Sequence, residues 1–273
     1  MNAMDRMECL ATPDDVHRDS QLLDVRWGLH DAPDAGVAAY LEGHIPGARF
    51  LDLATVLTGP TTDPTLGRHP LPDADALEHA LSSIGLDPAK PVIVYDVPGS
   101  FASGRAWWVL TWAGLHVRVL DGGWPAWLAA GGDVETGKRP LPEPTKVRLS
   151  LGHLPTVDEE AVESWPGTLI DVRAAERFRG TYEPIDAVAG HIPGAINRPV
   201  AELWTPDGRL PSEDALREYF GVLCEPVAVY CGSGVSAAHG VFALRLIGIE
   251  AALYPPSWSG WSADPDHAVA TGE

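Results

Sequence analysis

A single cysteine at the end of an apolar run carries the clearest chemical signal in the sequence. In VAVYCGSGVSAAHGV, residues 227–241, apolar residues give way to Cys231, Gly232, Ser233 and Gly234 before a helical pattern resumes. Small residues let the backbone curl so that N–H groups point at the sulfur, and the N-terminus of the following helix adds positive partial charge. Such a cradle favours the thiolate, the nucleophilic form of cysteine, and it would equally stabilise an anionic persulfide. We therefore expect Cys231 to be a catalytic nucleophile.

The other two cysteines give no sign of such a role. Cys9 and Cys224 form no C-x-x-C pair and lie near no histidine cluster, so neither a zinc site nor a disulfide framework is expected.

The loop after Cys231 does not have the C-x5-R pattern of the protein phosphatases, because the next arginine after Cys231 is Arg245, far along the predicted helix. We expect no metal and no organic cofactor.

The charge balance limits the partners of the protein. The 273 residues include 38 acidic and 19 basic residues, for a formal net charge of −19. Nucleic acid is not an expected partner, because its binding depends on neutralising phosphates. An anionic substrate must be attracted by a local positive field. No apolar run approaches the roughly 18 residues of a membrane span, and the N-terminal stretch MNAMDRMECLATPDD is too polar for a signal peptide. We therefore expect no membrane partner and a cytoplasmic location.

The elements that position the cysteine belong to a chain that repeats itself. Three motifs occur twice, namely LLDVRW at 22–27 and LIDVRA at 169–174, GHIPGA at 43–48 and 190–195, and PVIVYD at 91–96 and PVAVYC at 226–231. The apolar runs LLDV, VIVY and VRVL in the first copy and LIDV, VAVY and AALY in the second suit buried parallel strands. Amphipathic segments at 74–85 and 213–223 suit helices between them.

This alternation predicts two α/β domains, each with a small parallel sheet covered by helices on both faces. We place the first domain at 1–130 and the second at 146–273, joined by a linker at 131–145 that is rich in Gly, Pro and charge. Because Asp96 stands in the first copy where Cys231 stands in the second, we expect only the second domain to be catalytic.

The histidine of the GHIPGA motif is interpreted as structural. His44 and His191 occur in both copies, whereas only one copy has the cysteine. Proline fixes its own φ and glycine permits positive φ, so the motif is more simply a turn that leads into a strand.

The doubled GHIPGA, the paired DVR strands and the CGSGV loop together resemble the two-domain rhodanese family of sulfurtransferases, from about Leu22 to Trp261. The resemblance implies a tandem repeat of two rhodanese-like domains, of which the first is catalytically silent. It also implies that the Cys231 thiolate takes sulfur from a small anionic donor and forms a persulfide. The sulfur then passes to cyanide, a thiol or a thioredoxin-like protein.

The cysteine loop is similar to that of the 3-mercaptopyruvate sulfurtransferases. Members of the family that use thiosulfate more often have basic residues directly after the cysteine, whereas this loop is neutral. The resemblance implies catalytic roles for Cys231 and Ser233. It implies substrate-binding roles for four neighbouring residues of the loop and helix, which are Gly232, Gly234, Val235 and Ser236.

Arginines before the second GHIPGA motif are candidates for binding the donor. Arg177 matches the first of two family arginines that hold a substrate carboxylate, and the nearby Arg179 is a further candidate because a guanidinium can bind a carboxylate through two hydrogen bonds. The second family arginine falls on Asp186 in this sequence. We therefore expect weaker carboxylate binding than the family pattern implies.

The first domain is expected to contribute Asp52 and His69 to the substrate site. The catalytic aspartate of the mercaptopyruvate enzymes falls on Ala54 here, which makes Asp52 a candidate to replace it. We favour 3-mercaptopyruvate as the donor. Two alternatives stay open, namely a thiosulfate–cyanide sulfurtransferase (rhodanese) and a non-enzymatic sulfur-carrier or binding module.

Overall fold

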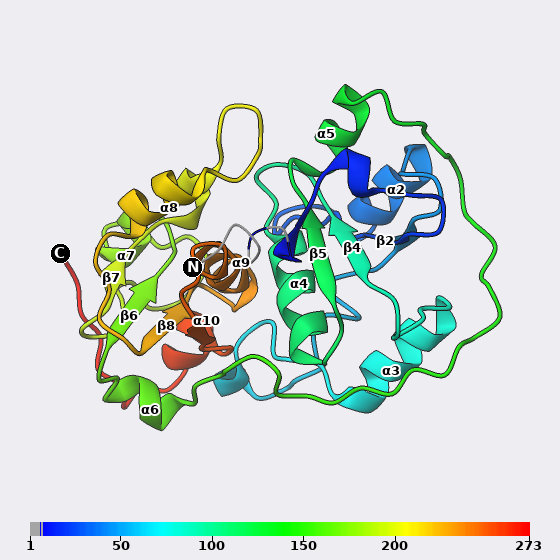
Figure 1. Ribbon diagram of the computed structural model, residues 1–273. Coiled ribbons are helices and arrows are strands. Elements are labelled where there is room, and N and C mark those ends of the chain that lie inside the picture. The colour runs from blue at the N-terminus through cyan, green and yellow to red at the C-terminus, as the bar shows by residue number, and fades with distance from the viewer. Residues whose placement is uncertain (1–5, 7) are drawn as a thin grey trace.

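The computed structural model describes residue 6 and residues 8–273, and Figure 1 shows two α/β units side by side. Residues 1–5 and 7 lie outside the described part, and with them much of the stretch from which the absence of a signal peptide was predicted. Both units contain a parallel sheet with helices on both faces, so the predicted fold class is confirmed.

The first half is built on a five-stranded sheet with the order β1-β5-β4-β2-β3, in which all pairs are parallel. Its elements, in chain order, are β1 (Leu10–Ala11), η1 (Pro13–Asp15), β2 (Gln21–Asp24), α2 (Ala35–Glu42), β3 (Arg49–Phe50), η2 (Pro64–Leu66), α3 (Ala74–Ser83), β4 (Val92–Tyr95), α4 (Ala102–Trp112), β5 (Val117–Leu120) and α5 (Gly123–Ala129).

The second half repeats this order with a four-stranded parallel sheet, β7-β6-β8-β9. Thr156 makes a parallel bridge to Leu253 and so extends the sheet beyond β9, where β1 lies beside β5 in the first half. Its elements are α6 (Glu159–Glu163), β6 (Thr168–Asp171), α7 (Ala175–Phe178), β7 (Ile196–Asn197), η3 (Val200–Leu203), α8 (Glu213–Phe220), β8 (Val227–Tyr230), α9 (Val235–Arg245), β9 (Ala251–Leu253) and α10 (Ser257–Trp261).

The central strands are apolar throughout because helices cover them on both faces. In β8, Val227 and Val229 face the core that also contains α8 and α9, whereas Ala228 and Tyr230 face the smaller core under α10. The six apolar runs predicted as strands form β2, β4, β5, β6, β8 and β9.

The two halves share one apolar core, because α4 and α9 pack against each other between the sheets (Figure 1). The rings of Trp107 and Phe242 meet there with centroids 4.8 Å apart. Gly104 makes the close approach possible, since a Cβ at this position would lie 2.6 Å from the Cβ of His239. Residues 131–158 form no helix or strand and run along the outside of the molecule to the second half (Figure 1).

The repeated motifs hold each sheet to its neighbouring loop. Arg173 pairs with Asp171 at 2.6 Å and donates to the carbonyl of Gly190, as Arg26 does with Asp24 and Gly43 in the first half. These contacts explain why a DVR strand and a GHIPGA turn occur together in both copies.

Both motif histidines have structural contacts, as interpreted from the sequence. The buried ring of His191 stacks on Phe178 and its Nδ1 lies 2.7 Å from the Phe178 carbonyl. His44 makes the equivalent contacts with Tyr40. Each GHIPGA turn leads directly into a short strand, β3 or β7.

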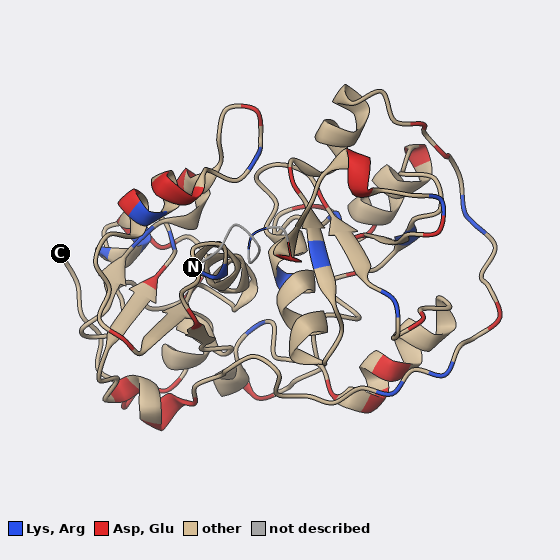
Figure 2. Cartoon of the chain, in the orientation of Figure 1, with Lys and Arg blue, Asp and Glu red and all other residues tan. Residues whose placement is uncertain are grey.

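Acidic side chains cluster on several outer helices as well as on loops. In Figure 2 they mark α3, α6 and α8, so attraction of an anion depends on charges inside the molecule. Among the described residues, none of the helices has the length and apolar character needed to cross a membrane.

Candidate active site

Cys231 lies at the carboxyl end of β8, directly before α9, which is where parallel sheets commonly place their chemistry. Its side chain is 1% exposed. The N–H groups of Gly234 and Ser233 donate to Sγ at 3.1 and 3.4 Å, and they form the cradle predicted from the sequence. Gly234 has a φ of 84°, and a Cβ there would lie 2.6 Å from the carbonyl oxygen of Pro255, so only glycine fits.

A serine that sequence reasoning missed lies beneath the cysteine. The hydroxyl of Ser257 accepts the N–H of Cys231 at 3.2 Å and lies 3.9 Å from Sγ. Ser257 has a φ of 54° and is the only non-glycine residue with positive φ in the part of the chain that the structure describes. Its counterpart in the first copy is Gly123, with a φ of 55°. The sequence does contain a signal for Ser257, because the equivalent position of the first copy is a glycine. A serine with positive φ is strained, and such backbone strain persists mainly where the side chain is needed.

The cysteine loop forms the floor of a cavity of about 360 Å³ between the two halves. This volume suits a small substrate. The first half contributes Trp27, Arg68 and Phe101 among others, and the second contributes Val172, Arg177 and Cys231 among others.

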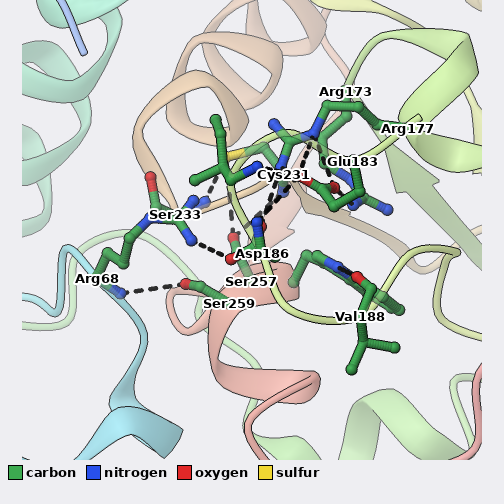
Figure 3. A network of polar contacts seen from close by, with 12 residues as sticks. Arg68, Arg173, Arg177, Glu183, Asp186, Val188, Cys231, Ser233, Ser257 and Ser259 are labelled. Atoms are coloured by element: carbon green, nitrogen blue, oxygen red, sulfur yellow. Dashed lines mark hydrogen bonds and ion pairs between the residues drawn. The ribbon is translucent and has the colours of Figure 1, made fainter. Parts of the chain in front are cut away.

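Two arginines from different halves flank the loop (Figure 3). Asp186 lies between them, where its Oδ2 accepts Nη2 of Arg177 at 2.9 Å and its Oδ1 pairs with Nη1 of Arg68. Gly232 lies beneath both guanidinium groups. A Cβ on Gly232 would lie 3.2 Å from Nη2 of Arg68 and 3.3 Å from Nη1 of Arg177.

A second layer of charge surrounds Arg177. Glu183 accepts the Nε of Arg177 at 2.9 Å and contacts Arg173 at 3.4 Å. Burial opposes ionisation of Glu183, but the hydrogen bonds from Arg177 and from the N–H groups of Asp186 and Ile185 hold the pKa of this carboxyl below its usual value. Arg173, Arg177 and Arg68 are thus matched by three carboxylates, those of Asp171, Glu183 and Asp186.

A buried cation from the first half supports the loop from below. The side chain of Arg105, on α4, is fully buried and has no acidic partner among the described residues. It donates to the carbonyls of Leu57 and His69 at 3.0 and 2.9 Å and to that of Gly234 at 3.3 Å. Burial lowers the pKa of Arg105 to about 10, so the guanidinium stays charged at neutral pH.

The loop residues predicted from the sequence lie together around the cavity, but Arg179, predicted beside them, does not line it. Its lining includes Gly232, Ser233, Val235, Ser236 and Arg177 beside Cys231, whereas Gly234 lies under the sulfur. Arg179 is exposed at the end of α7 and does not line it. The roles assigned to these residues stay predictions.

Asp52 and His69, the two residues expected from the first half, are not among the residues that line the cavity. The carboxylate of Asp52 accepts the N–H groups of Ala54 and Thr55 at 2.7 and 3.2 Å, which is a local turn contact. The ring of His69 meets Trp27, which lines the cavity, edge-on at 5.5 Å. Burial, and then the charges of Arg105 and Arg68, lower the pKa of His69 to about 4, so its ring is neutral at pH 7.

The equivalent site in the first half has no room for a substrate. Asp96 is 4% exposed, and its carboxylate accepts the N–H of Ser103 at 2.9 Å. It borders a cavity of about 10 Å³ that His239 also lines. Burial raises the pKa of Asp96 to about 7. This site is neither shaped nor charged to hold a sulfur donor.

One further group has ligand atoms close enough for a metal. Glu159, Asp264 and His267 each place one such atom within 4.8 Å of the others, away from the cavity. The Nε2 of His267 already pairs with Glu159, and the site chemistry around Cys231 does not involve this group.

Known proteins similar to this chain match it along most of its length. A family described as the rhodanese-like domain matches residues 10–130 and 157–264. SseB from Mycobacterium tuberculosis, provisionally named a thiosulfate sulfurtransferase, is 47% identical over 263 residues, which cover 92% of this chain and 90% of that protein. A protein from Pseudomonas aeruginosa, provisionally named a 3-mercaptopyruvate sulfurtransferase, is 41% identical over 268 residues and 93% of each chain. The solved 3-mercaptopyruvate sulfurtransferase of Leishmania major has a TM-score of 0.84 at 28% identity and covers 94% of this chain and 74% of that one.

Proposed function

Because this chain belongs to the rhodanese-like family and is a sulfurtransferase, we propose that Cys231 is the residue that accepts and releases the sulfur. The observation that carries the proposal is the pair of N–H groups that donate to Sγ at the floor of the cavity. The same groups support a thiolate before the transfer and a terminal persulfide sulfur after it.

The proposed reaction has two half-reactions. In the first, the Cys231 thiolate attacks the sulfur of 3-mercaptopyruvate, the S–S bond forms, and the C–S bond breaks with its electron pair leaving on the enolate of pyruvate. A proton then converts the enolate to pyruvate, and the hydroxyl of Ser233 is the proposed relay. In the second, cyanide or a thiol attacks the outer sulfur and regenerates the thiolate. The cytoplasm, where thiols stay reduced, is the proposed setting.

The charges at the site support mercaptopyruvate over thiosulfate as the donor. The three arginines that line the cavity, Arg68, Arg173 and Arg177, are each paired with a carboxylate, and the unpaired Arg105 lies outside the cavity lining with its N–H groups donated to carbonyls, so the cavity presents little net positive charge to a dianion. A donor with one carboxylate needs less positive charge, and the departing enolate uses the proton that a nearby hydroxyl can relay. Thiosulfate leaves as sulfite and requires no such proton.

The test uses the full chain and two cysteine variants. We expect Cys231→Ser to abolish turnover, whereas the exposed Cys224 serves as the matched control and Cys224→Ser should keep wild-type rates. Incubation with donor alone should add one sulfur atom to the wild-type mass, and steady-state kinetics should be ping-pong. Turnover that survives Cys231→Ser would refute the proposed nucleophile. A higher kcat/KM with thiosulfate than with 3-mercaptopyruvate would refute the proposed donor.

A further inference from the structure

Arg68 combines three features that a simple surface ion pair would not need. It comes from the first half, yet it lines the cavity above the Cys231 loop of the second half. Its backbone N–H donates to the hydroxyl of Ser259 at 3.1 Å, and its Nη1 pairs with Asp186. Its Nη2 lies over Gly232, the residue that directly follows the nucleophile.

Asp186 and Glu183 hold the guanidinium groups of Arg68 and Arg177 so that each keeps one terminal nitrogen with no hydrogen-bond acceptor in the described part of the chain. Asp186 takes Nη1 of Arg68 and Nη2 of Arg177, while Glu183 takes the Nε of Arg177. Within residues 8–273, neither Nη2 of Arg68 nor Nη1 of Arg177 has a hydrogen-bond partner. Both lie a little over 3 Å from the point where a Cβ on Gly232 would stand, so they converge on one space beside the nucleophile.

We infer that Arg68 is a donor-binding residue, and that the carboxylate of the donor takes one hydrogen bond from Arg68 and one from Arg177. This inference rests on the proposed function and names the residues that anchor its substrate. A carboxylate has two oxygens in one plane, and two converging guanidinium edges fit it well. Glycine at 232 leaves the space open, and Asp186 keeps both cations in position.

The inference also changes the expectation drawn from the sequence. Asp186 was expected to leave Arg177 without a second guanidinium. Instead, the carboxylate of Asp186 recruits one from the other half of the molecule. The donor site is therefore complete only when the two halves are docked.

A purely structural role for Arg68 makes a different prediction, and the chain offers a matched control. Arg209 of the second half lies 3.6 Å from Asp121 of the first, so this pair also crosses between the halves, but neither residue lines the cavity. If the Arg68–Asp186 pair only joins the halves, Arg68→Gln and Arg209→Gln should have similar effects.

The experiment measures donor kinetics and binding separately in the full chain. With saturating cyanide, Arg68→Gln should raise the KM for 3-mercaptopyruvate about tenfold or more and change kcat little, because a hydrogen bond between charged groups is lost. In a Cys231→Ser background, calorimetry should show the same loss in the affinity for pyruvate, which carries the carboxylate without the sulfur. Arg209→Gln should leave both quantities within about twofold of wild type, because this partly exposed pair lies outside the cavity.

Exchanging the charges of Arg68 and Asp186 distinguishes a loss of donor binding from misfolding of a single variant. Arg68→Asp alone should bind pyruvate poorly, and the double variant Arg68→Asp/Asp186→Arg should recover most of the affinity, because the pair is rebuilt with a guanidinium on the other side. Equal KM and pyruvate affinity in Arg68→Gln and Arg209→Gln, or no recovery in the double variant, would overturn the inference. If the wild type transferred no sulfur from either donor, the proposed function would fail, and pyruvate binding would still decide the role of Arg68.

Discussion

The first half of the molecule contains a buried carboxyl whose replacement should stabilise the protein. Asp96 is almost completely buried, and burial raises its pKa to about 7. Asparagine has the same shape and keeps an oxygen that can accept the N–H of Ser103. Asp96→Asn therefore removes the charge with little change in packing.

The sign of the effect follows from proton binding in the two states. Between pH 4 and pH 7 the unfolded chain has lost the Asp96 proton while the native state keeps it, so wild-type stability falls as pH rises through this range. Above about pH 7 both states are ionised and the loss is complete. Moving the pKa from 3.8 to about 7 makes the native state roughly 4 kcal/mol less stable at pH 8 than it would be with a neutral side chain.

Urea unfolding of both proteins between pH 5 and pH 8 measures this difference. The stability gained by Asp96→Asn should grow by about 1.4 kcal/mol per pH unit up to neutrality and then level off. Asp63→Asn is a control of opposite sign, because hydrogen bonds from Thr65 hold the pKa of Asp63 below its usual value. A gain from Asp96→Asn that is the same at pH 5 and pH 8 would show that burial does not keep this carboxyl protonated.

Three further predictions concern the assembled site. The fragment 146–273 lacks Arg68 and Arg105, and its kcat/KM should fall at least about tenfold below that of the full chain in the same cyanide assay. Equal activity would show that the second half does not need these two residues of the first half. Ser257→Ala should lower kcat roughly tenfold with little change in KM, since it removes the hydroxyl beside Cys231. Ser257→Gly should be equally slow but melt higher than the alanine variant, because glycine accepts positive φ; an active Ser257→Gly variant would contradict this role. Gly232→Ala should raise the KM for 3-mercaptopyruvate, because its methyl group would fill the space under the two guanidinium groups, and an unchanged KM would place the carboxylate elsewhere.

The sequence was sufficient to predict those parts of the fold and of the site that depend on local residue patterns or on the repeat. Strands such as VIVY and VAVY are apolar on both faces, and the small residues after Cys231 dictate the turn that cradles its sulfur. The strands β3 and β7 have two residues each and leave no apolar run to recognise.

The residues that reach across the interface could not be found in this way. Arg68 and Arg105 act on a loop more than 100 positions later in the chain, and neither stands in a repeated motif. Their roles depend on how α4 docks against α9, which is a matter of packing between the halves. Asp52 and His69 were expected at the substrate from the resemblance to the mercaptopyruvate enzymes. In the structure the Asp52 carboxylate accepts the N–H of Ala54, and the His69 ring packs against Trp27.

The helices α4 and α9 are equivalent elements of the two copies and pack against each other, as equivalent elements do across the interface of a two-fold dimer. Both helices end alike, with Leu115 donating to Leu110 and Ile249 donating to Leu244 at 3.0 Å, and this aligns Arg105 with His239, 134 residues later. Each helix therefore turns the same position toward the other half: Arg105 toward the Cys231 loop, and His239 toward the small cavity beside Asp96.

Burial lowers the pKa of His239 to about 4, so its imidazole is neutral at pH 7. A true homodimer of second halves would consequently present an uncharged ring to each Cys231 loop in place of a guanidinium. Joining two unlike copies in one chain removes that restriction, because one copy can keep the nucleophile while the other is free to supply the cation that supports it.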